Sequence, residues 1–352
     1  MGKYREKRVL IVGSAEESGG GVASAIRLMK KMPVWHNYHC YWLGTQIQAG
    51  KWTKLRYALT AYLKALFIIW RYDIVHFHTV PNVSMKIQLP VFLLALLGRK
   101  KIILHLHVGN QLTMAQYVNF KLGHWCMQKA DMLVLLADMF AGYLDKYWKD
   151  VKTPRQVIHN ACEEVIEIPY EQHQKTILFC GRFTDNKRAD ILIKAFGKIH
   201  QKYPDWRLQL LAKGPEEEGC RQLAKQLGIE AKVEMPGFVY GEEKAKYYRQ
   251  AGLFCLCSHY EGFPMVVLEA WAYGVPVLTT PVGALPDVVK DGKNGFIYNI
   301  DDVDGLVEKL DLLMANDELR LKMSRYSIEY AKRFSLQTIN GQLEELYLKV
   351  LK

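Results

Sequence analysis

The sequence lacks an apolar segment long enough to cross a bilayer. Its longest apolar run, Leu89–Leu97, is nine residues long in a chain of 352, whereas a transmembrane helix needs about 20. We also expect no cleavable signal before the first predicted strand. Half of the residues are hydrophobic, so the chain can bury a large core. We therefore expect a cytoplasmic protein with two domains.

Cysteines are few and irregularly spaced. The seven cysteines form neither the even-numbered framework of a disulfide scaffold nor a metal-ligand pattern. Cys255 and Cys257 are two residues apart, but in a strand they would share one face as small buried hydrophobes. We therefore expect a reduced protein without a metal or other cofactor.

Acidic residues are scarce in the first half of the chain. Residues 1–165 contain 22 Lys and Arg against 10 Asp and Glu, a net charge of +12, and residues 166–352 contain 25 against 26, a net charge of −1. A basic half predicts an anionic partner surface. No helix-turn-helix, zinc-finger or RNA-binding signature accompanies it. We therefore expect no nucleic acid and favour contact with an anionic membrane.

A dinucleotide fingerprint is also missing. Ser18-Gly-Gly-Gly-Val22 follows a strand and opens a helix, so its backbone N–H groups can approach a ligand closely. The G-x-G-x-x-G spacing is absent, and no acid ends the second strand. This disfavours a hydride-transferring oxidoreductase.

Apolar runs alternate with helical patterns along the chain, which predicts parallel sheets covered by helices. A polar break at 160–174 separates five predicted strands from six. The predicted strands are Arg8–Gly13, Tyr38–Leu43, Ile74–His78, Lys101–His107, Met132–Leu136, Lys175–Gly181, Arg207–Leu211, Val233–Pro236, Leu253–Cys257, Val275–Thr279 and Gly295–Tyr298. We expect two doubly wound domains, with the carboxyl ends of both sheets facing a central cleft.

The most informative segment is Glu261-Gly-Phe-Pro-Met-Val-Val-Leu-Glu269. It follows a buried strand and starts a helix, so Glu261 is predicted at the carboxyl end of a parallel strand, where open α/β sheets bind ligands. Two carboxylates with this spacing could bind the hydroxyls at the two ends of a nucleotide-sugar. Taken alone, two glutamates on a surface helix are more often simply solvated.

A second loop carries paired cations. Arg182 and Lys187 follow the strand Lys175–Gly181 and precede a predicted helix, so they could hold a diphosphate from two sides. Without further context, a solvated basic loop is an equal alternative.

Together these segments resemble the donor site of retaining glycosyltransferases of family 4, with the E-x7-E pair at Glu261 and Glu269 and the G-R-x4-K motif at 181–187. The resemblance implies the GT-B fold, two Rossmann-like domains at 1–165 and 166–335. It also implies a C-terminal helix, 336–352, that crosses back to the first domain. Arg188 stands where the family usually has glycine, which would alter the loop or add a phosphate contact.

The resemblance also implies roles for single residues. Arg182 and Lys187 neutralise the leaving diphosphate, Glu261 binds sugar hydroxyls, and Glu269 binds the ribose. His107, which ends a strand, matches the histidine that contacts the sugar 6-hydroxyl, although a strand histidine is more often a core residue. The implied catalytic residues are His107, Glu261, Arg182 and Lys187, and the implied donor-binding residues are Gly20, Gly21, Arg182, Lys187, Phe238, Val239, Glu261, Gly262, Phe263, Pro264, Met265, Val266 and Glu269.

The nearest D-x-D pair, Asp302 and Asp304, precedes a predicted helix, where acids serve as N-caps. Metal-dependent transferases of the other main fold bind Mn²⁺ with such a pair. Here the Arg182 and Lys187 cations can take that electrostatic role, so we expect no metal.

Residues 51–71 are predicted to form a helix with five cations and no acid. A helical stripe of Leu55, Leu59, Tyr62, Leu66 and Ile69 predicts a core-facing side. A packed helix with a solvated basic face is the simpler interpretation, and docking on anionic lipid is the alternative.

The sequence thus predicts a retaining, metal-independent hexosyltransferase. We expect it to use a nucleoside diphosphate sugar, UDP-sugar rather than GDP-sugar, and a saccharide or lipid-linked saccharide acceptor, in surface polysaccharide or glycoconjugate biosynthesis. The alternatives are an epimerase or phosphorylase of the same fold, or a catalytically silent sugar-binding module. We expect it in the cytoplasm or peripherally on the cytoplasmic face of the membrane.

Overall fold

The computed structural model describes residues 6–81, 83–107, 120–163, 165–166 and 174–352. The chain divides into two compact units. The first unit comprises Met1–Ala161 and Leu336–Lys352, and the second comprises Cys162–Ser335. Residues 164 and 167–173 of the predicted polar break lie outside the described residues.

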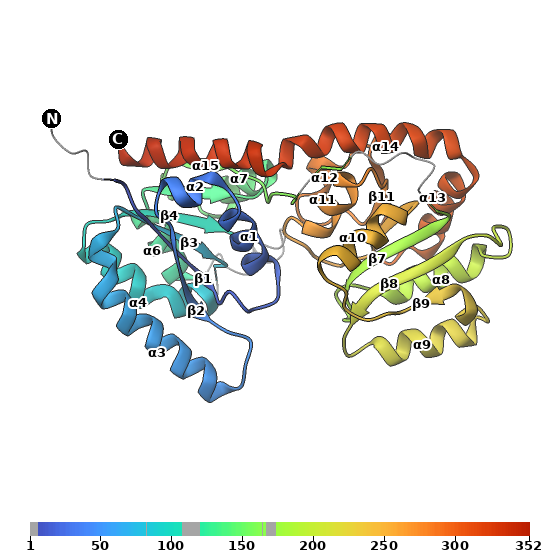
Figure 1. The fold of residues 1–352 in the computed structure, drawn as a ribbon, viewed down its shortest axis with the longest axis horizontal. Coiled ribbons are helices and arrows are strands. Elements are labelled where there is room, and N and C mark those ends of the chain that lie inside the picture. Colours follow the sequence, from blue (N-terminus) through green and yellow to red (C-terminus); the bar gives the residue numbers. More distant parts are fainter. Residues whose placement is uncertain (1–5, 82, 108–119, 164, 167–173) are drawn as a thin grey trace. The chain divides into compact units, whose positions relative to one another are not determined.

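The first unit is built on a six-stranded sheet in the order β2-β1-β3-β4-β5-β6, parallel throughout (Figure 1). Its strands are β1 Val9–Ser14, β2 Tyr41–Gln46, β3 Ile74–Thr79, β4 Lys101–Leu106, β5 Met132–Leu135 and β6 Arg155–Val157. Its helices are α1 Gly21–Lys30, α2 Pro33–Asn37, α3 Lys51–Ile68, α4 Val83–Leu97, α6 Lys121–Lys129, α7 Asp138–Tyr147 and α15 Leu336–Leu351. β6 was not predicted, because Arg155–Val157 contains a single apolar residue, and β2 begins three residues later than predicted.

The second unit repeats this plan with the strand order β12-β11-β10-β7-β8-β9, again parallel. Its strands are β7 Thr176–Arg182, β8 Arg207–Lys213, β9 Val233–Glu234, β10 Leu253–Leu256, β11 Val277–Thr279 and β12 Gly295–Ile297. Its helices are α8 Ala189–Ile199, α9 Glu217–Gln226, α10 Gly241–Gln250, α11 Met265–Ala272, α12 Leu285–Val288, α13 Val303–Ala315 and α14 Asp317–Ala331. The predicted doubly wound α/β class is therefore confirmed.

Helix α15 completes the core of the first unit. Its buried residues Ile339, Leu343 and Leu346 pack in one cluster with Val9 and Ile11 of β1. The removal of this apolar surface from water favours the docked helix, and Asn340 adds a side-chain acceptor for the Val34 N–H at 2.7 Å.

Helix α3 does not bury the side that the sequence predicted. Leu55, Leu59 and Leu66 are exposed, whereas the buried side chains of the helix are Ala61 and Ala65. Small side chains let α3 lie close to its neighbours, and its leucines are left on the outer side. The predicted core-facing stripe was wrong for these three leucines.

Within the described residues, no helix has both the length and the hydropathy that a bilayer span requires.

Candidate functional site

The carboxyl ends of β7 and β10 bring Lys187 and Glu261 together. The Lys187 ammonium donates to Glu261 Oε1, and the Ser258 hydroxyl donates to the same oxygen at 2.6 Å. Arg182 is the last residue of β7 and is exposed, with Lys213 opposite it in the ladder. Lys187 and Ser258 therefore hold the Glu261 carboxylate, and Arg182 and Lys213 end two neighbouring strands of the same sheet.

The backbone around Glu261 is held from two directions. Asn186 donates to the Tyr260 carbonyl at 3.1 Å and accepts from the Tyr260 N–H at 3.0 Å. On the other side, the Ala284 N–H donates to the Gly262 carbonyl at 2.9 Å. The left-handed conformation of Gly283, with φ of +55°, lets its backbone approach this loop so closely that a Cβ there would overlap the Gly262 and Glu261 carbonyl oxygens.

Helix α11 begins directly after this loop. Pro264 is its N-cap and Met265 its first residue. Phe263 is buried, and Val266 is half-buried on the first turn.

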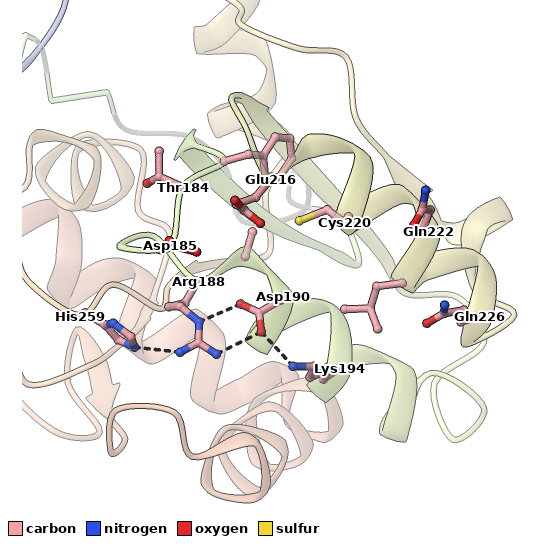
Figure 2. Close-up of a pocket in the computed structure, with 14 residues that line it drawn as sticks. Thr184, Asp185, Arg188, Asp190, Lys194, Glu216, Cys220, Gln222, Gln226 and His259 are labelled. Atoms are coloured by element: carbon pink, nitrogen blue, oxygen red, sulfur yellow. Dashed lines mark hydrogen bonds and ion pairs between the residues drawn. The ribbon is translucent and has the colours of Figure 1, made fainter.

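Arg188 is paired with side chains of its own unit. It occupies the left-handed region at φ +47°, and its guanidinium binds Asp190, His259 and Asp301. Figure 2 shows Arg188 and Lys194 both turned toward Asp190 beside a cavity of about 560 Å³. Burial opposes ionisation of Asp190, but the hydrogen bonds from Arg188 and Lys194 lower its pKa to about 2.

Glu269 lines a separate cavity of about 440 Å³. The Lys244 ammonium donates to both of its oxygens, at 2.8 and 2.7 Å, and the Tyr248 hydroxyl donates to Oε2 at 3.0 Å. The exposed Tyr240 and the ring of Tyr273 also line this cavity. An acidic acceptor between aromatic rings suits a ribose and its base.

Two of the implied donor-binding residues, Phe238 and Val239, lie close in the chain to Tyr240 of this cavity. Phe238 is partly exposed and its ring centroid lies 6.2 Å from that of Tyr240, whereas Val239 is buried. Gly237 has φ of +94°, and a Cβ there would overlap the Lys213 side chain. The sequence analysis did not identify Lys213 and Lys244 as site residues, because no local sequence pattern distinguishes a lysine whose partner is distant in the chain.

The remaining predicted residues belong to the first unit. Gly20 is the N-cap of α1 with φ of +106°, and a Cβ on Gly20 or Gly21 would meet no atom within 4 Å. The first turn of α1 contains no acidic residue, so its N–H groups suit an anion. His107 Nε2 and His78 Nδ1 lie 3.0 Å apart and share a hydrogen bond. Burial lowers the pKa of His107 to about 4, which keeps its imidazole neutral.

Residues 163–330 match the family model of glycosyl transferases group 1. This segment is a glycosyl transferase group 1 domain. It contains Arg182, Lys187, Glu261 and Glu269.

Two relatives in sequence agree with this assignment. An uncharacterized glycosyltransferase of Haemophilus influenzae is 35% identical over 166 residues, which are 47% of this chain and 46% of that protein. A D-inositol 3-phosphate glycosyltransferase of Corynebacterium aurimucosum is 30% identical over 181 residues, which are 50% of this chain and 43% of that protein. The chain thus spans about half the length of the relatives it matches.

The fold is shared over almost the whole chain with the Anabaena protein Alr3699/HepE, whose crystal structure contains UDP. The TM-score is 0.78 at 16% identity, over 97% of this chain and 100% of that one. This likeness establishes the predicted GT-B fold.

Among the described residues, the side chains able to share a metal ion are His76, His78 and His105, outside the group 1 domain. Their ring planes lie within 9° to 33° of one another, with centroids 4.6 to 5.5 Å apart. Imidazole lone pairs lie in the ring plane, so in stacked rings they run side by side and do not converge on one ion. Burial and the neighbouring imidazoles lower the pKa of each ring well below its usual value. We therefore interpret the cluster as neutral stacked rings.

Both acids of the D-x-D pair, Asp302 and Asp304, make contacts within the fold. Asp302 caps α13, with its side chain accepting from the Gly305 N–H at 2.8 Å, as the sequence predicted. Asp304 pairs with Lys198 at 2.6 Å.

Proposed function

We propose that this chain is a retaining glycosyltransferase of family 4. It moves a hexosyl unit from a nucleoside diphosphate sugar, a UDP-sugar rather than a GDP-sugar, to a saccharide or lipid-linked saccharide acceptor. The observation that carries the proposal is the ion pair of Lys187 with Glu261 at the strand ends of the group 1 domain, where Arg182 is the last residue of β7. UDP in the HepE crystal structure supports the choice of nucleotide.

The cations act on the leaving diphosphate. Negative charge grows on its oxygens as the glycosidic bond breaks, and preorganised ammonium and guanidinium groups stabilise that charge. Lys187 is already held by Glu261 and is 21% exposed, so little reorganisation is required when the donor binds. In this scheme Glu261 accepts hydrogen bonds from the hexose hydroxyls, and its pairing with Lys187 joins sugar recognition to diphosphate recognition.

The hexose and acceptor contacts of the first unit are assigned by the family resemblance. His107 is neutral and its Nε2 is paired with His78 Nδ1, so Nδ1 is the ring nitrogen that can exchange a hydrogen bond with a sugar hydroxyl. For retention, the acceptor hydroxyl attacks the same face that the diphosphate leaves, and a departing phosphate oxygen takes its proton. The new bond joins the acceptor oxygen to the anomeric carbon, and the bond to the diphosphate breaks.

Glu269 anchors the nucleotide through the ribose diol. UDP at about 100 times its Kd should stabilise the wild-type protein by roughly 2.7 kcal/mol. Glu269→Gln keeps the shape but removes the charged acceptor, a loss of about 1.5–3 kcal/mol, so UDP should bind about 10- to 150-fold more weakly. Calorimetric titration with free UDP measures this change.

The matched control for this variant is Glu308→Gln, which removes an exposed acid paired with Lys309 in α13. Its UDP affinity should equal that of the wild type. Equal UDP binding by Glu269→Gln and the wild type would exclude the ribose assignment.

The transfer should need no metal ion, because Arg182 and Lys187 supply the positive charge and the D-x-D acids are engaged by a helix cap and by Lys198. We expect turnover to be unchanged after incubation with EDTA and removal of the chelator. Turnover that falls with EDTA and returns with Mn²⁺ would show that a metal takes part. The measurement is release of UDP from the donor in the presence of acceptor.

In this proposal the protein works in the cytoplasm or peripherally on the cytoplasmic face of the membrane, where a lipid-linked saccharide would be anchored, in surface polysaccharide or glycoconjugate biosynthesis.

A further inference from the structure

The outer side of α3 carries a continuous apolar stripe. Trp52, Leu63 and Phe67 are 76%, 60% and 76% exposed. At 100° per residue, every member of the stripe falls within an arc of about 120°. The stripe consists of Trp52, Leu55, Leu59, Leu63, Leu66 and Phe67 of α3, and it continues to Trp70 in the 3₁₀ turn Ile69–Arg71, all of these seven residues being exposed.

Helix α4 extends this stripe. α3 and α4 lie side by side (Figure 1), and the Tyr62 hydroxyl donates to the Ile87 carbonyl at 2.6 Å. Leu93 and Leu97 of α4, one helical turn apart, are 47% and 73% exposed. Near the ends of both helices, Lys100 donates to the Trp70 carbonyl at 3.0 Å. We call the seven stripe residues, Leu93 and Leu97 the α3–α4 apolar surface.

Cations lie within and beside this surface. Lys51, Lys54, Arg56, Lys64 and Arg71 are exposed, and residues 51–72 include no Asp or Glu. On the same projection, Arg56 falls inside the apolar arc and Lys54 falls on the opposite side. Lys51 and Lys64 fall about 100° and about 120° to either side of Trp52. Soluble proteins rarely expose so many large apolar side chains together. Apolar side chains between basic residues match an anionic bilayer surface, with an acyl boundary between phosphate headgroups.

We propose that the α3–α4 apolar surface inserts into the interface of an anionic membrane. The apolar side chains enter the headgroup–acyl boundary, and the cations within and beside this surface bind lipid phosphates. Presentation of a lipid-linked acceptor to the first unit rests on the proposed function, whereas the docking itself does not. If the protein bound the membrane through charge alone, high salt would abolish binding. If the apolar side chains insert, part of the binding should persist at high salt.

Co-sedimentation of the full chain with vesicles tests this, in the absence of donor and acceptor. We expect binding to vesicles with equal amounts of phosphatidylglycerol and phosphatidylcholine, and weaker binding to phosphatidylcholine alone. The triple variant Leu59→Ser, Leu63→Ser and Phe67→Ser should bind at least tenfold more weakly at every salt concentration. Joint change of Lys51, Lys54 and Arg56 to Gln should weaken binding about 100-fold at low salt, about fivefold per cation.

Matched controls lie elsewhere on the chain. Leu312→Ser with Leu348→Ser changes two exposed leucines outside the surface, and Lys198→Gln with Lys202→Gln removes exposed cations of the second unit. Both should bind vesicles as the wild type does. Every variant should keep wild-type UDP affinity, which separates a failure of docking from a failure of the proposed function.

Two outcomes would overturn the inference. In one, vesicle binding is changed neither by salt nor by the substitutions. In the other, the wild type binds no vesicles and is a dimer that the serine triple variant converts to a monomer, which would assign the surface to a second copy of the chain. Light scattering after size exclusion distinguishes this second case.

Discussion

Lys187→Ala is expected to lower kcat about 10²- to 10³-fold, with a smaller change in the KM for the donor. Loss of one preorganised group that stabilises a developing oxyanion costs this much in other enzymes. The charge on the leaving diphosphate is larger in the transition state than in bound donor, so the effect falls on turnover. Arg182→Ala should act in the same direction. Steady-state kinetics with a UDP-sugar donor measures both.

Lys187 also holds Glu261, so its electrostatic and positioning roles must be separated. A double-mutant cycle with Glu261→Gln does this, because a residue that acts only by holding Glu261 loses its effect once that carboxylate is gone. We expect Lys187→Ala to reduce kcat further in the Glu261→Gln background. Lys194→Ala, which removes a partner of Asp190 near the same loop, is the matched control and should retain wild-type kcat. If the Arg182 and Lys187 variants both changed KM for the donor and left kcat unchanged, stabilisation of the leaving diphosphate by these two residues would be contradicted.

Gly283→Ala is expected to destabilise the second unit and displace the Glu261 loop. A Cβ at this position strains the left-handed backbone, at a cost of about 1–2 kcal/mol. It also overlaps the carbonyl oxygens of Gly262 and Glu261, and overpacking adds about 1–3 kcal/mol. We therefore expect about 2–5 kcal/mol in all, together with loss of most of the transferase activity. Denaturant unfolding and kinetics measure the two effects.

Gly292→Ala is the matched control for this prediction. Gly292 has φ of +70°, but a Cβ there would lie 3.8 Å from the nearest atom, in the Phe296 ring. It therefore carries the backbone strain without the overlap and should cost about 1–2 kcal/mol, with activity retained. Equal stability and activity of the two variants would show that neither folding nor activity depends on the close approach of Gly283 to the Glu261 loop.

Part of the site could be predicted because its residues are close in sequence. Glu261 and Gly262 stand in one loop before α11, Arg182 ends β7, and Lys187 stands in the loop that follows β7. Each loop follows a buried strand, so its position at a sheet edge follows from local pattern alone. The partners of these residues come from distant segments. Lys244 on Glu269 and Gly283 behind Gly262 are contacts that no local pattern reports.

The sequence by itself determined the two parallel sheets, the donor motifs and the basic character of the first half. These depend on periodicity, strand-end loops and composition, which are properties of short segments or of simple counts. Only the tertiary structure decided which side of α3 is buried. That helix has apolar residues on more than one side, and its small Ala61 and Ala65 fit against the neighbouring elements where leucines do not. Steric fit between elements distant in sequence chose the alanine side, and the leucines and aromatics were left exposed.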